Sequence, residues 1–433
     1  MDNDVVAVVG FVVLFLLMAL RVPVGIAMGL VGLGGFAAVS GITPALNLMA
    51  MSPIRTVTDH SLALIPMFIL MGSFATATGL SRELFQATNA WFGRQRGGLA
   101  MGTITACGGF AAICGSSVAT AATMTKIALP EMRKAGYSDA LATGVIAAGG
   151  TLGILIPPSI VLAIYGFITD QDVGQLFIAG IIPGILAICL HLGVIKIISI
   201  LKPGSVPEGK SSTWEEKTRS LRNIWAVVLL FGAIIGGIYS GIVTPTEAAA
   251  MGAFFTFLIG IVRRRLDLKT TGLCLIDALR TSVTIFTILI GALLFGYFLT
   301  ITQTPQQVTG YLIGLPFGPY GILLVILLFY FVLGCVLDAM AMIILTVPIL
   351  FPVVTALGFD PIWFGIIVVM TVELGLITPP VGLNVFVINS VARDVSLVTI
   401  FKGVMPFVLA DIVRLAILIA IPALVLFLPE RMA

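Results

Sequence analysis

Apolar runs of about 20 residues recur from one end of this chain to the other, and an α-helix of that length crosses the hydrocarbon core of a bilayer. Of the 433 residues, 59% are hydrophobic and 10% are charged, whereas a soluble domain keeps about a quarter of its residues charged. The chain is therefore predicted to be an all-α polytopic membrane protein in a lipid bilayer, and no nucleic-acid partner is expected.

Two kinds of apolar segment can be distinguished. Two long stretches, 99–130 and 320–357, are interrupted near the middle by small or polar residues at 115–117 and 334–338. Such an interruption lets a segment turn back, so we predict two re-entrant helical hairpins. The other runs are predicted to be ten transmembrane helices, at 5–20, 22–41, 62–80, 139–168, 176–200, 224–241, 246–262, 282–301, 362–390 and 406–428.

The distribution of Lys and Arg supports this topology, because cytoplasmic loops carry the excess of both residues. With two hairpins, all of the 23 Lys and Arg except Arg55, Arg414 and Arg431 fall at one side of the membrane. Counting either hairpin as a single crossing would place many of these Lys and Arg residues on the opposite side of the membrane. We therefore predict an inner-membrane protein with a periplasmic N-terminus, in which the two hairpins open to opposite sides, as in inverted repeats.

A short repeated motif supports the inverted symmetry. Residues 152–158 read Leu-Gly-Ile-Leu-Ile-Pro-Pro, and residues 374–380 read Leu-Gly-Leu-Ile-Thr-Pro-Pro. Each copy lies within a predicted crossing that follows a hairpin. Two adjacent prolines lack two backbone donors, so each helix must break there. Half-helix N-termini attract anions, and unwound carbonyls bind cations, so the breaks are predicted to form ion and solute sites at the bilayer midplane.

These features divide the chain into parts. The first repeat half is predicted at 61–168 and includes hairpin 99–130, and the second at 282–390 includes hairpin 320–357. The basic amphipathic stretches 82–97 and 266–280 are predicted to be interfacial arms, with ordinary loops as the alternative. Scaffold helices are predicted in the remaining segments, 1–60, 169–281 with a cytoplasmic loop at 202–222, and 391–433.

Ionisable residues within apolar runs are functional candidates by default. Asp338 and Glu373 border the second break, and for Asp338 a helix cap is an equally good interpretation. Asp411 and Arg414 are three residues apart on one helix and are expected to pair and neutralise each other. His191 is interpreted as a structural histidine.

The chain carries several short motifs in a characteristic order, namely Ser61–Gly72, Gly115–Ser117, Gly136–Tyr137, Ile156–Ser159, Phe177–Gly184, Thr244–Ala248 and Thr378–Gly382. On these motifs it resembles the large membrane subunit of the tripartite ATP-independent periplasmic (TRAP) transporters, along nearly its full length. The resemblance implies a Na⁺-driven symporter of the bacterial inner membrane that takes up an organic acid by an elevator mechanism. It also implies two partners, a periplasmic substrate-binding protein and a separate small four-helix membrane subunit.

The resemblance further implies positions for the binding residues. One Na⁺ would be bound by Ser116 with carbonyls near Gly153, Ile156 and Pro157. The second Na⁺ would be bound near Gly334, Gly375, Thr378 and Val381. The substrate would lie near Ser117, Thr120, Asp338 and Asn384. Because Ile156 stands where Thr378 stands, the first ion site would depend more on backbone oxygens.

Several other functions are alternatives for a chain of this kind. A stand-alone Na⁺/dicarboxylate symporter that needs no binding protein is the nearest alternative, and a channel is another. An enzyme is not expected, because the chain has two His and neither an HExxH nor a GxSxG motif. It also has no GxxxxGK[ST] loop for ATP, which argues against a primary pump.

Overall fold

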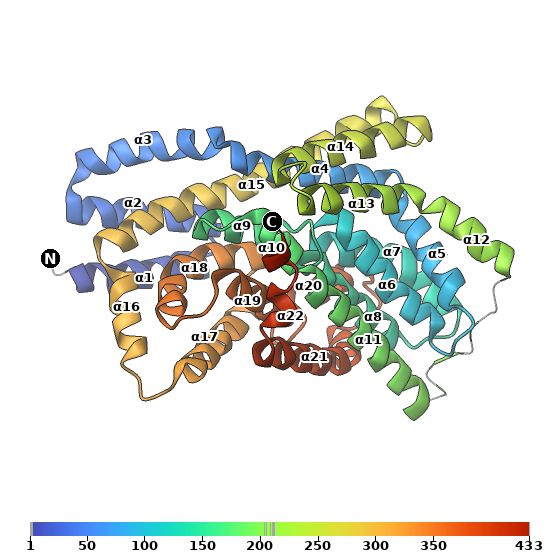
Figure 1. The fold of residues 1–433 in the computed structure, drawn as a ribbon. Coiled ribbons are helices and arrows are strands. Elements are labelled where there is room, and N and C mark those ends of the chain that lie inside the picture. Colours follow the sequence, from blue (N-terminus) through green and yellow to red (C-terminus); the bar gives the residue numbers. More distant parts are fainter. Residues whose placement is uncertain (1–2, 203, 205, 208, 210–212, 433) are drawn as a thin grey trace.

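The computed structural model describes all residues except 1–2, 203, 205, 208, 210–212 and 433. The described residues form helices and no strand (Figure 1). The helices are α1 (Asn3–Ala19), α2 (Val24–Ser40), α3 (Ile42–Thr58), η1 (His60–Ala63), α4 (Leu64–Ala77), α5 (Leu80–Phe92), α6 (Gly98–Cys114), α7 (Ser117–Lys134), α8 (Asp139–Leu155), α9 (Ile160–Thr169), α10 (Val173–Ala179), α11 (Ile181–Leu201), α12 (Trp214–Asn223), α13 (Trp225–Tyr239), α14 (Pro245–Val262), α15 (Leu268–Ile301), α16 (Thr304–Ile313), α17 (Pro319–Gly334), α18 (Ala339–Ala356), α19 (Pro361–Leu376), α20 (Leu383–Val391), α21 (Leu397–Ala420), α22 (Ala423–Leu426) and η3 (Pro429–Arg431).

Long apolar helices dominate the structure, and the prediction of an all-α polytopic membrane protein is confirmed. Among the described residues, seven segments are individually long and apolar enough to cross a membrane. Some of them combine two helices, such as α8 with α9 and α10 with α11. One of the seven is α18, which belongs to the second predicted hairpin.

Both predicted hairpins consist of two helices that contact each other across a short turn. In the first, α6 and α7 are joined at Gly115 and Ser116, and Gly115 has a left-handed backbone with φ 63°. In the second, α17 and α18 are joined by residues 335–338. Each hairpin packs against the broken helix that follows it, α8 for the first and α19 for the second.

In the described part of the chain, four α-helices lie where neither a crossing nor a hairpin was predicted: α3, α5, α12 and α16. Helix α5 covers much of the amphipathic stretch 82–97. The second predicted arm, 266–280, is not a separate element, because α15 runs without interruption from Leu268 to Ile301. No proline occurs within that range, so nothing in the local sequence ends the helix. The predicted loop 202–222 lies partly outside the described residues, and its described end forms α12.

Two groups of helices can be followed in Figure 1. Helix α15 packs along α2 and α4, and α4 also packs against α14. In the other group, α8 is surrounded by α6, α7 and α21, and α21 also contacts α11 and α19. Glycines allow the closest crossings, since a Cβ atom added at Gly291 would lie 1.9 Å from the carbonyl oxygen of Gly25. The division of the chain into moving and fixed parts stays a prediction.

Candidate functional site

The first helix break lies against the tip of the first hairpin. Helix α8 ends at Leu155 and α9 begins at Ile160, and the Pro157–Pro158 peptide bond is cis. A Cβ atom added at Gly153 would lie 2.6 Å from the carbonyl oxygen of Ser116. The sequence-predicted residues Ser116 and Gly153 are therefore brought into contact, from two different helices.

Hydrogen bonds order the first hairpin tip. The Ser116 hydroxyl accepts a hydrogen bond from the backbone N–H of Ala119, and the Thr120 hydroxyl donates to the Ser116 carbonyl oxygen at 2.8 Å. The Ile156 side chain lies against α11, because a Cβ atom added at Gly184 would lie 2.8 Å from it. Among the atoms of Ile156, only the backbone oxygen is thus suited to bind an ion at this break.

The second break repeats this arrangement. Helix α19 ends at Leu376 and α20 begins at Leu383, and the Pro379–Pro380 bond is also cis. A Cβ atom added at Gly375 would lie 2.4 Å from the carbonyl carbon of Gly334, so the broken helix and the second hairpin touch backbone to backbone. The Thr378 hydroxyl donates to the Leu374 carbonyl oxygen at 2.5 Å. Val381 lies in the same non-helical segment and is half-buried.

The predicted substrate residues do not all have the same surroundings. Ser117, Thr120 and Asn384 are buried, and α20, which carries Asn384, packs against α7, which carries the other two. Neither the nitrogen nor the oxygen of the Asn384 amide has a hydrogen-bond partner among the described residues. A buried amide without partners costs free energy. Asn384 is therefore the best-suited of these residues to bind a polar ligand.

Asp338 has a clear structural role. Its carboxylate accepts hydrogen bonds from the backbone N–H groups of Met340 and Ala341, at 3.0 and 3.1 Å, and so caps the N-terminus of α18. The sequence left two interpretations of Asp338 open, a functional acid and a helix cap, and the structure shows the cap. A negative charge at this position would also repel a carboxylate substrate that came close to it.

A cluster of four ionisable side chains is buried beside the second break. The Arg414 guanidinium donates to Glu373 at 3.2 Å and lies 3.1 Å from the Asp411 carboxylate. The same carboxylate oxygen is 3.1 Å from the imidazole Nε2 of His191. All four side chains are at most 3% exposed. The expected pairing of Asp411 with Arg414 is confirmed, and the cluster joins α11, α19 and α21.

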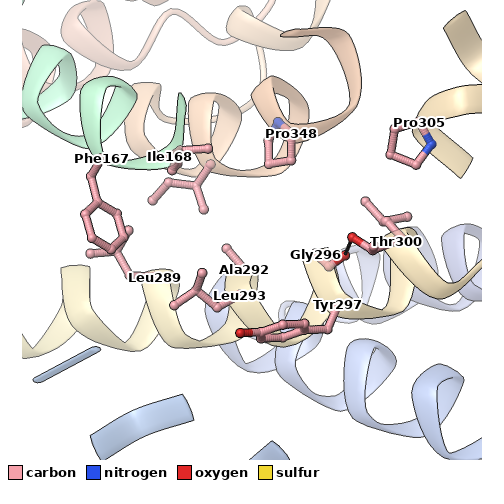
Figure 2. Close-up of a pocket in the computed structure, with 12 residues that line it drawn as sticks. Phe167, Ile168, Leu289, Ala292, Leu293, Gly296, Tyr297, Thr300, Pro305 and Pro348 are labelled. Carbon is pink, nitrogen blue, oxygen red and sulfur yellow. Dashed lines mark hydrogen bonds between the residues drawn. The ribbon is translucent and has the colours of Figure 1, made fainter. Parts of the chain in front are cut away.

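A cavity of about 350 Å³ lies between α15 on one side and α9 and α18 on the other. Figure 2 shows Phe167 and Ile168 of α9 and Pro348 of α18 on one side, facing residues of α15 on the other. A Cβ atom added at Gly296, which lines the cavity, would have no atom within 4 Å. No residue proposed above for ion or substrate binding lines it among the described residues. The contact of α15 with α9 and α18 is thus loosely packed at this level.

The comparison with protein families decides what kind of chain this is. Residues 11–424 match the model of the DctM component of the tripartite ATP-independent periplasmic transporters. The chain belongs to the DctM family. The resemblance to the TRAP large membrane subunit is thereby confirmed, and the match includes both hairpins and both helix breaks.

Individual DctM relatives are similar over most of their length. The C4-dicarboxylate TRAP transporter large permease protein of Pseudomonas aeruginosa is 38% identical over 402 residues, which cover 90% of this chain and 93% of the relative. The sialic acid TRAP transporter large permease protein of Vibrio cholerae is 32% identical, covering 94% and 95%. The isethionate TRAP transporter permease protein DctMQ of Oleidesulfovibrio alaskensis is 34% identical, and this chain covers 65% of it.

A solved structure supports the DctM fold. The YdaH transporter of Alcanivorax borkumensis superposes with a TM-score of 0.65, covering 88% of this chain and 90% of that chain. The two sequences are 14% identical. At that identity the likeness concerns the fold alone.

The sequence did not predict the whole buried cluster of ionisable residues beside the second break. It predicted the pairing of Asp411 with Arg414, but it did not connect either residue with Glu373 or His191. Glu373 lies 41 positions before Arg414, and His191 lies 220 positions before Asp411. The only sequence signal was the presence of four ionisable residues within apolar runs, which by itself suggests that they need partners.

Proposed function

We propose that this chain is the large transport subunit of a Na⁺-coupled secondary active transporter that takes up an organic acid. The observation that carries the proposal is the pair of helix breaks, each in backbone contact with a hairpin tip, in a chain of the DctM family. Two relatives are named for C4-dicarboxylates and sialic acid, which supports an organic acid as substrate.

Na⁺ is a cargo ion here, and oxygen atoms are the ligands that hard cations prefer. We propose that the first Na⁺ binds at the Ser116 hydroxyl and at the carbonyls of Gly153, Ile156 and Pro157. The second would bind at Gly334, Gly375, Thr378 and Val381. The proposed ligands of both ions are hydroxyl and carbonyl oxygens, and among the described residues no group of three or more His, Cys, Asp and Glu could hold a metal ion.

We place the substrate between the tips, close to Ser117, Thr120 and Asn384. The unpartnered amide of Asn384 can both donate to a carboxylate and accept from a hydroxyl group. In this proposal Asp338 stabilises the second hairpin tip by capping α18, and it does not bind the anionic substrate directly. The chain is proposed to act as a transporter and not as an enzyme.

The proposed partners are a periplasmic substrate-binding protein and a small membrane subunit. The N-terminus is proposed to be periplasmic. The experiment that tests this function is uptake of a candidate organic acid into proteoliposomes that hold this chain and its small membrane subunit, with and without the binding protein and an inward Na⁺ gradient. Uptake that requires both supports the proposal. Uptake driven by Na⁺ alone would instead make the chain a stand-alone symporter.

Thr378→Val is expected to raise the Na⁺ concentration for half-maximal uptake by about tenfold, because it removes one hydroxyl ligand of a charged ion. Ser116→Ala is expected to act in the same direction at the first site. The control is Thr371→Val, since Thr371 is a buried threonine of α19 whose hydroxyl, like that of the half-buried Thr378, donates to the backbone carbonyl four residues earlier. An equal Na⁺ dependence of Thr378→Val and Thr371→Val would contradict the assignment of Thr378.

Gly296→Trp is expected to reduce the rate of uptake roughly tenfold or more, because the side chain would fill the cavity between α15 and the helices α9 and α18 and hinder a movement of these helices past one another. The open space around Gly296 should leave folding intact, which the thermal unfolding midpoint measures. Gly232→Trp on α13 is the control, since a Cβ atom there also meets no neighbour. Unchanged uptake by Gly296→Trp would argue against such a movement.

A further inference from the structure

A second, polar hollow lies at the junction of α4, α5 and the end of α14. Its volume is about 560 Å³. It is lined by Ala77, Thr78, Gly79, Arg82, Glu83, Gln86, Asn223 and Arg265. None of these residues belongs to the helix breaks or the hairpins, so the transport site does not account for the hollow.

Ion pairs build one wall of the hollow. Glu83 is 12% exposed and accepts from Arg263 at 2.6 Å and from Arg265 at 2.8 Å. Arg265 also donates to the carbonyl oxygen of Thr78 at 2.7 Å. The guanidinium of Arg265 is thus held in a defined place at the wall.

Positive charge prevails in the hollow. The single negative charge of Glu83 faces both Arg263 and Arg265, and Arg82 has no ion pair among the described residues. The hollow also includes the first turn of α5, whose N-cap Gly79 provides no side-chain cap for the backbone N–H groups. Uncapped N–H groups add partial positive charge. The chemistry of the hollow therefore suits an anion such as a phosphate group.

The surroundings place the hollow at a membrane surface. Helix α14 is long and apolar enough to span a bilayer, and it ends at Val262, directly before Arg263. The Arg263 guanidinium lies 5.8 Å from the ring centre of Trp225, which is half exposed. Tryptophan and arginine at the end of a span mark the interface between lipid and water. The distribution of Lys and Arg predicts that this is the cytoplasmic surface.

Helix α14, which ends beside the hollow, carries exposed apolar side chains. Phe254, Leu258 and Ile261 are exposed on this helix and would contact lipid in a membrane. A ligand with a phosphate at one end and acyl chains at the other fits both features. We propose that the hollow binds the headgroup of an anionic phospholipid of the cytoplasmic leaflet, whose chains lie along α14. Bound lipid would join α5 to α14, which are separated in the sequence by the helices α6 to α13.

The test uses the full chain with its small membrane subunit in phosphatidylcholine nanodiscs, into which phosphatidylglycerol is titrated while the unfolding midpoint is measured. Phosphatidylglycerol is expected to raise the midpoint with saturation. For Arg82→Gln, about fivefold more of it should be required for half of the effect, which corresponds to about 1 kcal/mol per basic residue near a membrane surface. Arg280→Gln is the matched control, since Arg280 is exposed on α15 outside the hollow.

Gln86→Glu provides a second variant, which adds a negative charge to the hollow without removing an arginine. It is expected to weaken the phosphatidylglycerol effect as Arg82→Gln does. The proposal is overturned if the phosphatidylglycerol dependence of the unfolding midpoint changes equally in Arg82→Gln, Gln86→Glu and Arg280→Gln. General surface charge would then explain the stabilisation. A third arm adds inorganic phosphate without anionic lipid. If phosphate alone gives the same saturable stabilisation, the hollow binds a soluble anion and the lipid proposal is wrong.

Discussion

Replacement of Arg414 by Met is expected to destabilise the protein by about 3–5 kcal/mol, which is the usual cost of removing one partner from a buried ion pair. The wild-type cluster contains two carboxylates, and Arg414 contacts both of them. Without the guanidinium, buried Asp411 would keep His191 at 3.1 Å, and buried Glu373 would have no ion-pair partner in the described structure. The loss should appear as a lower unfolding midpoint and a lower yield of folded protein in detergent.

Two comparison variants test whether the unpaired buried charge, and not the loss of any arginine side chain, causes the destabilisation. Glu373→Gln combined with Arg414→Met removes one negative charge together with the positive one, and it should recover part of the lost stability. Arg280→Met removes an exposed arginine on α15 and should change the midpoint little. A folded Arg414→Met protein with an unchanged midpoint would contradict the prediction.

Gly375→Ala is expected to reduce uptake by about 100-fold, because catalytic or binding groups that are misplaced by about 1 Å can lose that much activity. The added Cβ atom would lie 2.4 Å from the carbonyl carbon of Gly334, whereas nonbonded carbon atoms need about 3.5 Å. The second hairpin tip would therefore have to move away from the broken helix by about 1 Å. Gly153→Ala is expected to act in the same way at the first tip.

Two measurements check this prediction. The rate of uptake into proteoliposomes should fall for both variants, while Gly232→Ala, where a Cβ atom meets no neighbour, keeps the wild-type rate. The Na⁺ concentration for half-maximal uptake should rise for Gly375→Ala if the displaced atoms bind the ion. Wild-type uptake by Gly375→Ala would show that the contact between the two backbones is not needed for transport.

The local chemistry of the sequence was sufficient to predict most of the helices, both hairpins and both breaks, but not α3, α12 or α16. The end of α8 before Ile156 follows from the two prolines after it, since neither can donate to a helical hydrogen bond. The turn at Gly115 follows from a residue that adopts a left-handed backbone without strain. The same local chemistry was misleading at 266–280, where basic residues suggested a separate arm although the helix continues into the following apolar run.

The resemblance to a family, taken from motifs in a fixed order, was also available from the sequence and is confirmed. The roles of Ser116, Thr378 and Asn384 in ion and substrate binding stay predictions. For these residues the structure adds contacts between elements, such as the approach of Gly153 to Ser116 and of Gly375 to Gly334.

The sequence by itself thus determined most of the helical segments and where two of them break, because hydropathy, proline and glycine act within a few residues of one another. The order of its short motifs determined the family. Only the tertiary structure decided that Glu373 meets Arg414, that His191 meets Asp411, and that each helix break touches its own hairpin tip. These contacts join residues far apart along the chain. They depend on how whole helices pack, and no local pattern specifies that packing.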